Sequence, residues 1–135
     1  IAEAERDAPE VLALRLTVLQ ERCEWPALRA VAAEFVRRSP AEPAGWVTWA
    51  YATRRAESLA AAEKILLEAE RLHPAEATIQ FNLGCYACQR GALAEARRRV
   101  NRAIALDKKF AAAAATDPDL APLRAAGHAD CPPSA

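Results

Sequence analysis

The sequence predicts an all-α protein built from repeated helical hairpins, and three observations support this fold class. Alanine, the strongest helix former, provides 35 of the 135 residues, whereas valine, isoleucine and threonine together provide 15. Four glycines leave few positions for tight turns between strands. Prolines recur at a fixed interval, because Pro43 follows Pro9 at the same distance as Pro74 follows Pro40. This interval, about 34 residues, is typical of helical repeat architectures.

The proline spacing sets a register of three blocks, residues 9–42, 43–76 and 77–110. Each block contains two segments of about 14 residues with helical apolar periodicity, separated by a short turn. Each block therefore predicts one helical hairpin. Residues 1–8 are expected to be a leader or the end of a preceding helix.

The third block carries the clearest motif, and the other two carry parts of it. It reads Asn82-Leu83-Gly84, Arg90-Gly91, Leu93, Ala96, Val100, Ala103 and Leu106-Asp107. Equivalent residues are Trp46, Ala50, Leu59, Ala62, Leu66, Ala69, Leu72 and Pro74 in the second block, and Leu12, Leu16, Trp25, Leu28, Ala32, Phe35 and Pro40 in the first. The pattern resembles the tetratricopeptide repeat, which has Trp-x2-Leu-Gly-x2-Tyr, then Ala-x3-Phe, then Pro within one repeat. The resemblance implies an α-α superhelix, a right-handed solenoid of three hairpins, of a bacterial type with no assigned role.

Small residues and helix-ending residues explain how such hairpins would pack. Gly84 and Ala50 allow the first helix of a pair to approach the second closely, with Ala62 and Ala96 opposite them. Proline disfavours helical geometry at the residue before it, so Pro40 and Pro74 are expected to end the second helices. Gly91 can adopt the left-handed conformation that closes a helix.

The period stops after residue 110, and residues 111–127 are predicted to be a capping region. Asp117 and Pro118 are typical of a helix N-cap followed by its first residue, which predicts a helix over residues 118–126 ending before Gly127. Leu120 and Leu123 would cover the apolar face of the last repeat. Residues 128–135 are expected to be a disordered tail.

Several functional classes lack support in the sequence. The 18 basic and 18 acidic residues balance, and no apolar run approaches the roughly 18 residues of a membrane span. Cys85 and Cys88 form a Cys-x-x-Cys that falls inside a predicted helix, without the further ligands that zinc needs. His73 and His128 have no partner at a spacing that suggests a catalytic relay. We therefore expect no catalytic residues, no metal and no cofactor.

The resemblance places a concave binding groove on the first helix of each hairpin. Carried over by register, the groove would be lined by Ala13, Leu14, Thr17, Gln20, Glu21, Val47, Thr48, Tyr51, Arg54, Arg55, Phe81, Asn82, Cys85, Cys88 and Gln89. Tyr51 and Phe81 would anchor a ligand, and Arg54 and Arg55 would bind acidic groups, because such residues dominate interface energies. Packing between repeats is the alternative role for Tyr51 and Phe81.

A basic face is the second candidate surface. Residues 77–110 carry seven basic and two acidic side chains, and four of the bases are Arg97, Arg98, Arg99 and Arg102. Glu95 can pair with Arg98 and Arg99 on the same helix. A solvated helix face is one interpretation, and weak binding of RNA or an acidic partner is the other. The lack of interleaved aromatic residues disfavours nucleic acid.

The sequence thus favours an adaptor or scaffold module that binds a protein or peptide segment of unknown identity. Three alternatives remain: self-association into a homo-oligomer, a binder similar to the small secretion chaperones of bacteria, and the basic face just described. We expect a cytoplasmic chain, because its four scattered cysteines fit a reducing compartment. We also expect it to be a piece of a longer protein, because it contains no methionine.

Overall fold

The computed structural model describes residues 8–130, and the all-α prediction is confirmed over this range, which contains no strand. The chain divides into two compact units, Ile1–His73 and Pro74–Ala135, whereas the sequence indicated one domain. The boundary falls at Pro74, which ends the packed helical segment of the second block. No helix of the described part is long and apolar enough to cross a bilayer.

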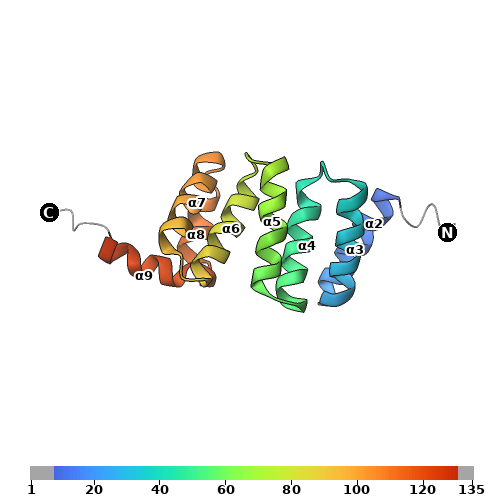
Figure 1. The fold of residues 1–135 in the computed structure, drawn as a ribbon, viewed down its shortest axis with the longest axis horizontal. Coiled ribbons are helices and arrows are strands. Elements are labelled where there is room, and N and C mark those ends of the chain that lie inside the picture. Colours follow the sequence, from blue (N-terminus) through green and yellow to red (C-terminus); the bar gives the residue numbers. More distant parts are fainter. Residues whose placement is uncertain (1–7, 131–135) are drawn as a thin grey trace. The chain divides into compact units, whose positions relative to one another are not determined.

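The helix boundaries repeat the period of the sequence. The first unit contains α2 (Pro9–Glu21), α3 (Trp25–Arg38), α4 (Pro43–Ala56) and α5 (Leu59–Leu72); the second contains α6 (Ala77–Gln89), α7 (Leu93–Leu106), α8 (Phe110–Thr116), the 3₁₀ turn η1 (Pro118–Leu120) and α9 (Ala121–Asp130) (Figure 1). The starts of α2, α4 and α6 are separated by one constant interval, and the starts of α3, α5 and α7 are separated by the same interval. Pro9 and Pro43 start their helices because the first turn needs no N–H donor.

In the first unit each helix packs against the next one along the chain. The core joins α2, α3 and α4 through buried residues that include Leu12, Leu28, Phe35 and Ala52. A side chain at Gly45 would place its Cβ 2.5 Å from the ring of Phe35, so α4 can lie this close to α3 only because Gly45 has none. Ala50 and Ala62, which the sequence placed at the α4–α5 crossing, are fully buried.

The backbone carbonyl of Pro40 contacts two side chains from other parts of the first unit. The indole Nε1 of Trp46 donates to the carbonyl of Pro40 at 2.9 Å, and the imidazole Nε2 of His73 lies 2.9 Å from the same oxygen. Because a carbonyl only accepts hydrogen bonds, Nε2 must carry the proton. His73 therefore fixes the end of α5 to the turn before α4.

The second unit is built on the hairpin of α6 and α7. A Cβ at Gly84 would lie 2.8 Å from Cγ2 of Val100 and 3.3 Å from the carbonyl oxygen of Ala96, so the predicted close crossing is present. The rings of Phe81 and Phe110 pack with centroids 4.9 Å apart, which joins α8 to α6. Leu120 and Leu123 are buried, where η1 contacts α6 and α9 contacts both α6 and α7.

The C-terminal boundaries differ from those predicted. Residues 118–120 form a 3₁₀ turn, in which Asp117 caps the N–H of Asp119 at 2.9 Å, and the α-helix starts only at Ala121. The helix then continues through Gly127 and His128 to Asp130, although a disordered tail was expected from residue 128. Glycine weakens a helix by about 1 kcal/mol relative to alanine but does not forbid it. Residues 131–135 and most of the predicted leader, residues 1–7, lie outside the described part.

Two turns use left-handed backbone geometry at equivalent positions. Gly91 has a φ of 88°, and Cys23, which lies two repeats earlier, has a φ of 55°. In both turns the left-handed residue and the next one donate backwards, Cys23 to Gln20 and Glu24 to Leu19 in the first. This double bond pattern closes the end of a helix. Glycine suits the position, whereas cysteine strains it.

We expect Cys23→Gly to stabilise the protein by about 1 kcal/mol, because a Cβ in left-handed geometry costs about that much. Urea unfolding followed by circular dichroism under reducing conditions would measure the difference. Cys23→Ala is the control, since it removes the thiol and keeps the Cβ. Equal unfolding free energies for the two variants would contradict the assignment of strain to Cys23.

Candidate functional site

The groove residues predicted in the first unit are accessible. Thr17, Gln20 and Glu21 on α2 are exposed, together with Ala13 and Leu14. On α4, Arg55 is exposed, and the half-buried residues are Val47, Thr48, Tyr51 and Arg54. The surface of α4 therefore offers aromatic and basic groups to a ligand.

Tyr51 is the centre of an aromatic and cationic cluster. Its ring meets the ring of Trp25 edge to face, with centroids 5.6 Å apart and planes at 65°. The guanidinium of Arg55 lies 3.5 Å from the Tyr51 ring centroid and 5.3 Å from that of Trp25. Its Nη1 also donates to the carbonyl of Tyr51 at 3.2 Å. We call Trp25, Tyr51 and Arg55 the Tyr51 cluster.

The sequence identified two members of this cluster and missed the third. Tyr51 and Arg55 lie four residues apart on α4, so the helical period brings them together. Trp25 begins α3, and only the packing of α3 on α4 places it against Tyr51. In the sequence Trp25 indicated only the start of a helix. In the structure its ring is half-buried beside Tyr51.

The predicted groove residues of the second unit are mostly buried. Phe81 was expected to anchor a ligand, but it is 5% exposed and packs on Phe110 at the start of α8, a contact within the third block and not the packing between repeats that was its alternative role. Cys85 and Cys88 are buried as well. Asn82 is half-buried, and Gln89 is exposed but donates to the carbonyl of Asp119 at 2.8 Å. The helix α6 is buried more completely than a groove wall because α7, η1 and α9 contact it and Phe110 of α8 packs on it.

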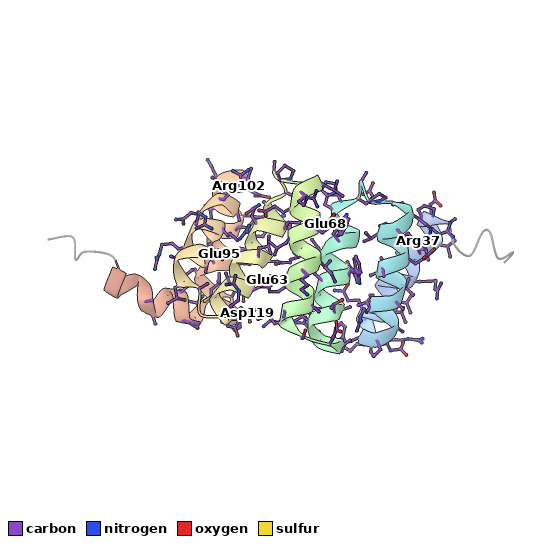
Figure 2. The ribbon with its side chains drawn as sticks, in the orientation of Figure 1. Arg37, Glu63, Glu68, Glu95, Arg102 and Asp119 are labelled. Carbon is purple, nitrogen blue, oxygen red and sulfur yellow. The ribbon has the colours of Figure 1, made fainter. Side chains whose placement is uncertain are left out.

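The four arginines of the basic face have different roles. Arg99 is largely buried and donates to Gln80 Oε1 at 3.1 Å and to Glu95 at 3.2 Å. Arg102, near the end of α7 (Figure 2), donates to the carbonyl of Pro74 at 3.2 Å. Arg98 is exposed and Arg97 is half-buried. The face is therefore partly a structural network.

Glu95 balances the charge of this network. It pairs with Arg99, as predicted, and with Arg90 at 3.1 Å, whereas the sequence suggested Arg98. Burial raises the pKa of Glu95, but the hydrogen bonds and charges of Arg90 and Arg99 outweigh it and hold the pKa below its usual value. Glu95 thus stays ionised and neutralises part of the basic face.

Cys85 lies near two aspartates. Its Sγ and the carboxylate oxygens of Asp117 and Asp119 lie within 4.8 Å of one another. The only further zinc ligands that the sequence suggested were the cysteines Cys23 and Cys131, so neither aspartate was predicted beside Cys85. Asp117 accepts a hydrogen bond from the N–H of Asp119 as the cap of η1. Because that cap already explains the position of Asp117, the cluster does not by itself define a metal centre.

Comparison with models of known protein families gives no match, and comparison with curated proteins gives none either. The fold defines the class of the protein as an all-α protein with three helical hairpins that recur at one constant interval.

We expect Arg99→Ala to destabilise the second unit by about 1–3 kcal/mol, because it removes the two hydrogen bonds that the largely buried guanidinium donates, one to Glu95 and one to the side-chain oxygen of the buried Gln80. Arg98→Ala is the control and should change the unfolding free energy by less than about 0.5 kcal/mol. Chemical denaturation of both variants tests this difference. Equal effects would show that the basic face is uniform.

Proposed function

We propose that the chain is a tetratricopeptide-type module that binds an acidic peptide segment through the Tyr51 cluster. The regular recurrence of helix starts supports the repeat type, together with the close crossings at Gly84 and between Ala50 and Ala62. In that family the first helix of each hairpin lines the groove, and Tyr51 and Arg55 lie on such a helix. The proposal assigns the module no catalytic role.

The observation that carries the proposal is the stacking of Arg55 on Tyr51 at an accessible surface. A guanidinium held by an aromatic ring loses less freedom on binding than a mobile one, so its bonds to a carboxylate cost less entropy. Among the described residues, Arg55 donates one N–H group, to the carbonyl of Tyr51, and a guanidinium has four further N–H donors that a ligand can use. Trp25 adds apolar area beside the charge, a combination that is typical of interface anchors.

Selection from a phage-displayed library of random peptides would test this proposal. We expect the wild type to enrich sequences that combine Asp or Glu with a large apolar residue. Synthetic peptides from the selection should bind at least tenfold more weakly to Tyr51→Ala and to Arg55→Glu, measured by fluorescence anisotropy. This loss corresponds to about 1.4 kcal/mol or more of binding energy.

Arg71→Ala is the matched control, because Arg71 is exposed on α5 and pairs within its own helix, with Glu68. It should bind the selected peptides as the wild type does. Circular dichroism would establish that all variants remain helical. Equal affinities of the wild type and Tyr51→Ala would refute the role of the cluster.

Self-association is a second candidate function, favoured by an apolar face on α2 and α3. This face is a groove of about 320 Å³ that includes Val11, Leu14, Val18 and Val31, and Leu14 is 69% exposed. One repeat after Val11 and Val18, the equivalent residues Gly45 and Ala52 pack against α3. Because the equivalent face of α4 packs on a preceding helix, the α2–α3 face can pack on a helix of another hairpin. In this second candidate function, a second copy of the chain supplies that helix.

Sedimentation velocity over a hundredfold range of concentration would test the α2–α3 face. We expect the sedimentation coefficient of the wild type to rise with concentration and that of Leu14→Glu to stay constant, because a buried charge opposes association. Thr17→Glu, on an exposed neighbouring position of α2, should behave as the wild type. A wild type that stays monomeric throughout would exclude this function.

A further inference from the structure

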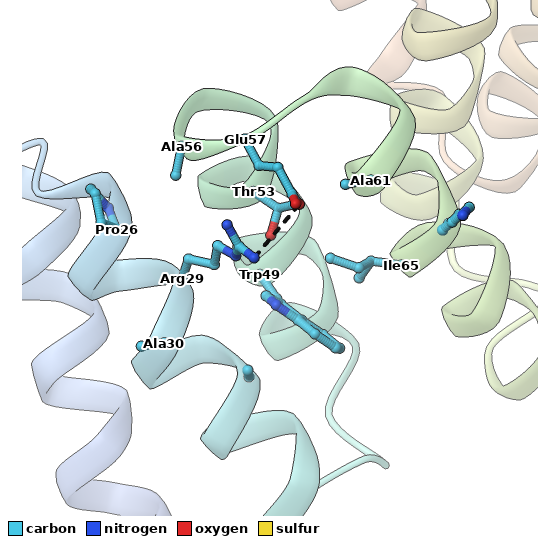
Figure 3. Close-up of a pocket in the computed structure, with 11 residues that line it drawn as sticks. Pro26, Arg29, Ala30, Trp49, Thr53, Ala56, Glu57, Ala61 and Ile65 are labelled. Carbon is cyan, nitrogen blue, oxygen red and sulfur yellow. Dashed lines mark ion pairs between the residues drawn. The ribbon is translucent and has the colours of Figure 1, made fainter.

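A cleft opens on the side of α4 that carries Trp49 and Thr53. Its volume is about 580 Å³, and α3, α4 and α5 form its walls within the first unit (Figure 3). Pockets of this size accommodate small organic ligands. None of the residues that line the cleft belongs to the groove or the basic face predicted from the sequence, and none belongs to the Tyr51 cluster.

Small side chains create the cleft. Ala30 and Ala33 on α3 face the cleft together with Ala61 on α5, where larger residues would fill the space. Trp49 and Ile65 supply broader apolar walls. The body of a ligand would therefore contact aromatic and aliphatic groups.

Thr53 provides a polar atom without a partner. The residue is 2% exposed, and its hydroxyl is a buried polar atom with no hydrogen bond in the described part of the chain. A buried hydroxyl without a partner is destabilising, so such groups usually have an unseen partner. Figure 3 shows Thr53 pointing toward the same part of the cleft as Arg29 and Glu57. Because the hydroxyl is buried, a ligand atom can reach it only when the pair of Arg29 and Glu57 opens.

The charges at the mouth select the ligand. Arg29 and Glu57 pair at 3.6 Å, and their side chains are 40% and 48% exposed. Such a long, hydrated pair contributes little to stability and can be exchanged. Lys64 adds a second basic side chain, so the residues that line the cleft include two basic groups, Arg29 and Lys64, and one acidic group, Glu57. A single negative charge fits this balance, whereas Glu57 would repel a dianion.

We infer that this cleft binds a small carboxylic acid with an apolar body. The carboxylate takes the place of Glu57 at Arg29 and accepts from the hydroxyl of Thr53, and the apolar body lies against Trp49. Arg29 is suited to this task because its planar guanidinium matches a carboxylate in two parallel bonds. The inference is independent of the proposed function, since it uses neither Tyr51 nor Arg55.

Titration with 3-phenylpropionate, followed by ¹H–¹⁵N NMR, tests the inference. We expect saturable shifts of the Trp49 indole N–H and the Thr53 amide with a Kd on the order of 1 mM or tighter, as befits a ligand of this size. Trp49→Phe assigns the indole signal. The neutral 3-phenylpropanamide, which has the same shape, should bind at least tenfold more weakly. Equal binding of acid and amide, or no saturable shift, would overturn the inference.

Two variants report on the exchange at Arg29. Arg29→Gln should weaken binding of the acid at least tenfold, whereas Glu57→Gln should strengthen it severalfold because it removes the competing carboxylate. If the cleft bound its ligand through apolar contacts alone, these two substitutions would not change the affinity for the acid in opposite directions. An unchanged or weaker affinity of Glu57→Gln would refute the exchange.

Thr53→Val keeps the shape of the side chain and removes only the hydroxyl. It should weaken binding of the acid by about threefold to tenfold, as expected for one hydrogen bond. Arg37→Gln is the matched control on α3: its side chain is 66% exposed, it pairs with Glu34, and it does not line the cleft (Figure 2). It should leave the affinity unchanged, and a loss equal to that of Arg29→Gln would overturn the assignment to Arg29.

A capped dipeptide distinguishes the two sources of such a carboxylate. N-acetyl-Phe-Glu-amide carries the same groups as the free acid but places them on a peptide. Tighter binding of the dipeptide would assign the cleft to an acidic side chain of a peptide and overturn a free acid as its ligand. Weaker binding would support the free acid.

Discussion

The close crossing of adjacent helices is the constraint on which both units depend. Gly45 brings α4 to the ring of Phe35 on α3, and Gly84 brings α6 to Val100 on α7. A methyl group at either position would overlap a side chain that cannot easily move, since overpacking forces side chains from their rotamers. Small residues also form the cleft beside Trp49, where the side chains of alanines on α3 and α5 are too short to fill the space. Packing and candidate binding thus arise from one property of the sequence.

The periodicity of the chain predicted the three hairpins closely. Prolines and apolar spacing mark each helix start from Pro9 to Leu93, and these signals are local. The C-terminal segment was harder, because Asp117 and Pro118 predict a start without distinguishing a 3₁₀ turn from an α-helix. Gly127 predicts a helix end, yet α9 continues through it, because glycine closes a helix where it adopts left-handed geometry, as Gly91 does.

The candidate sites were predictable only where their residues share a helix. Tyr51 and Arg55 follow from helical spacing, but Trp25 joins them through tertiary packing. Phe81 appeared suitable for a groove, but it packs on Phe110, the last residue of the third block and the first of α8, whose contact with α6 no local motif predicts. The Arg29–Glu57 pair and the unpartnered hydroxyl of Thr53 come together only where α3 packs on α4, so no single segment of sequence contained them.

The consecutive packing of α2 on α3, α3 on α4 and α4 on α5 has a consequence for the speed of folding. Contacts between neighbouring helices require the closure of short loops only, and the entropy of loop closure grows with loop length. Proteins with such low contact order fold in microseconds to milliseconds. The contact between His73 and the carbonyl of Pro40, 33 residues apart, is among the longer-range bonds of the first unit, and it forms as soon as two hairpins have met. A nascent chain can therefore complete this unit hairpin by hairpin as it is synthesised.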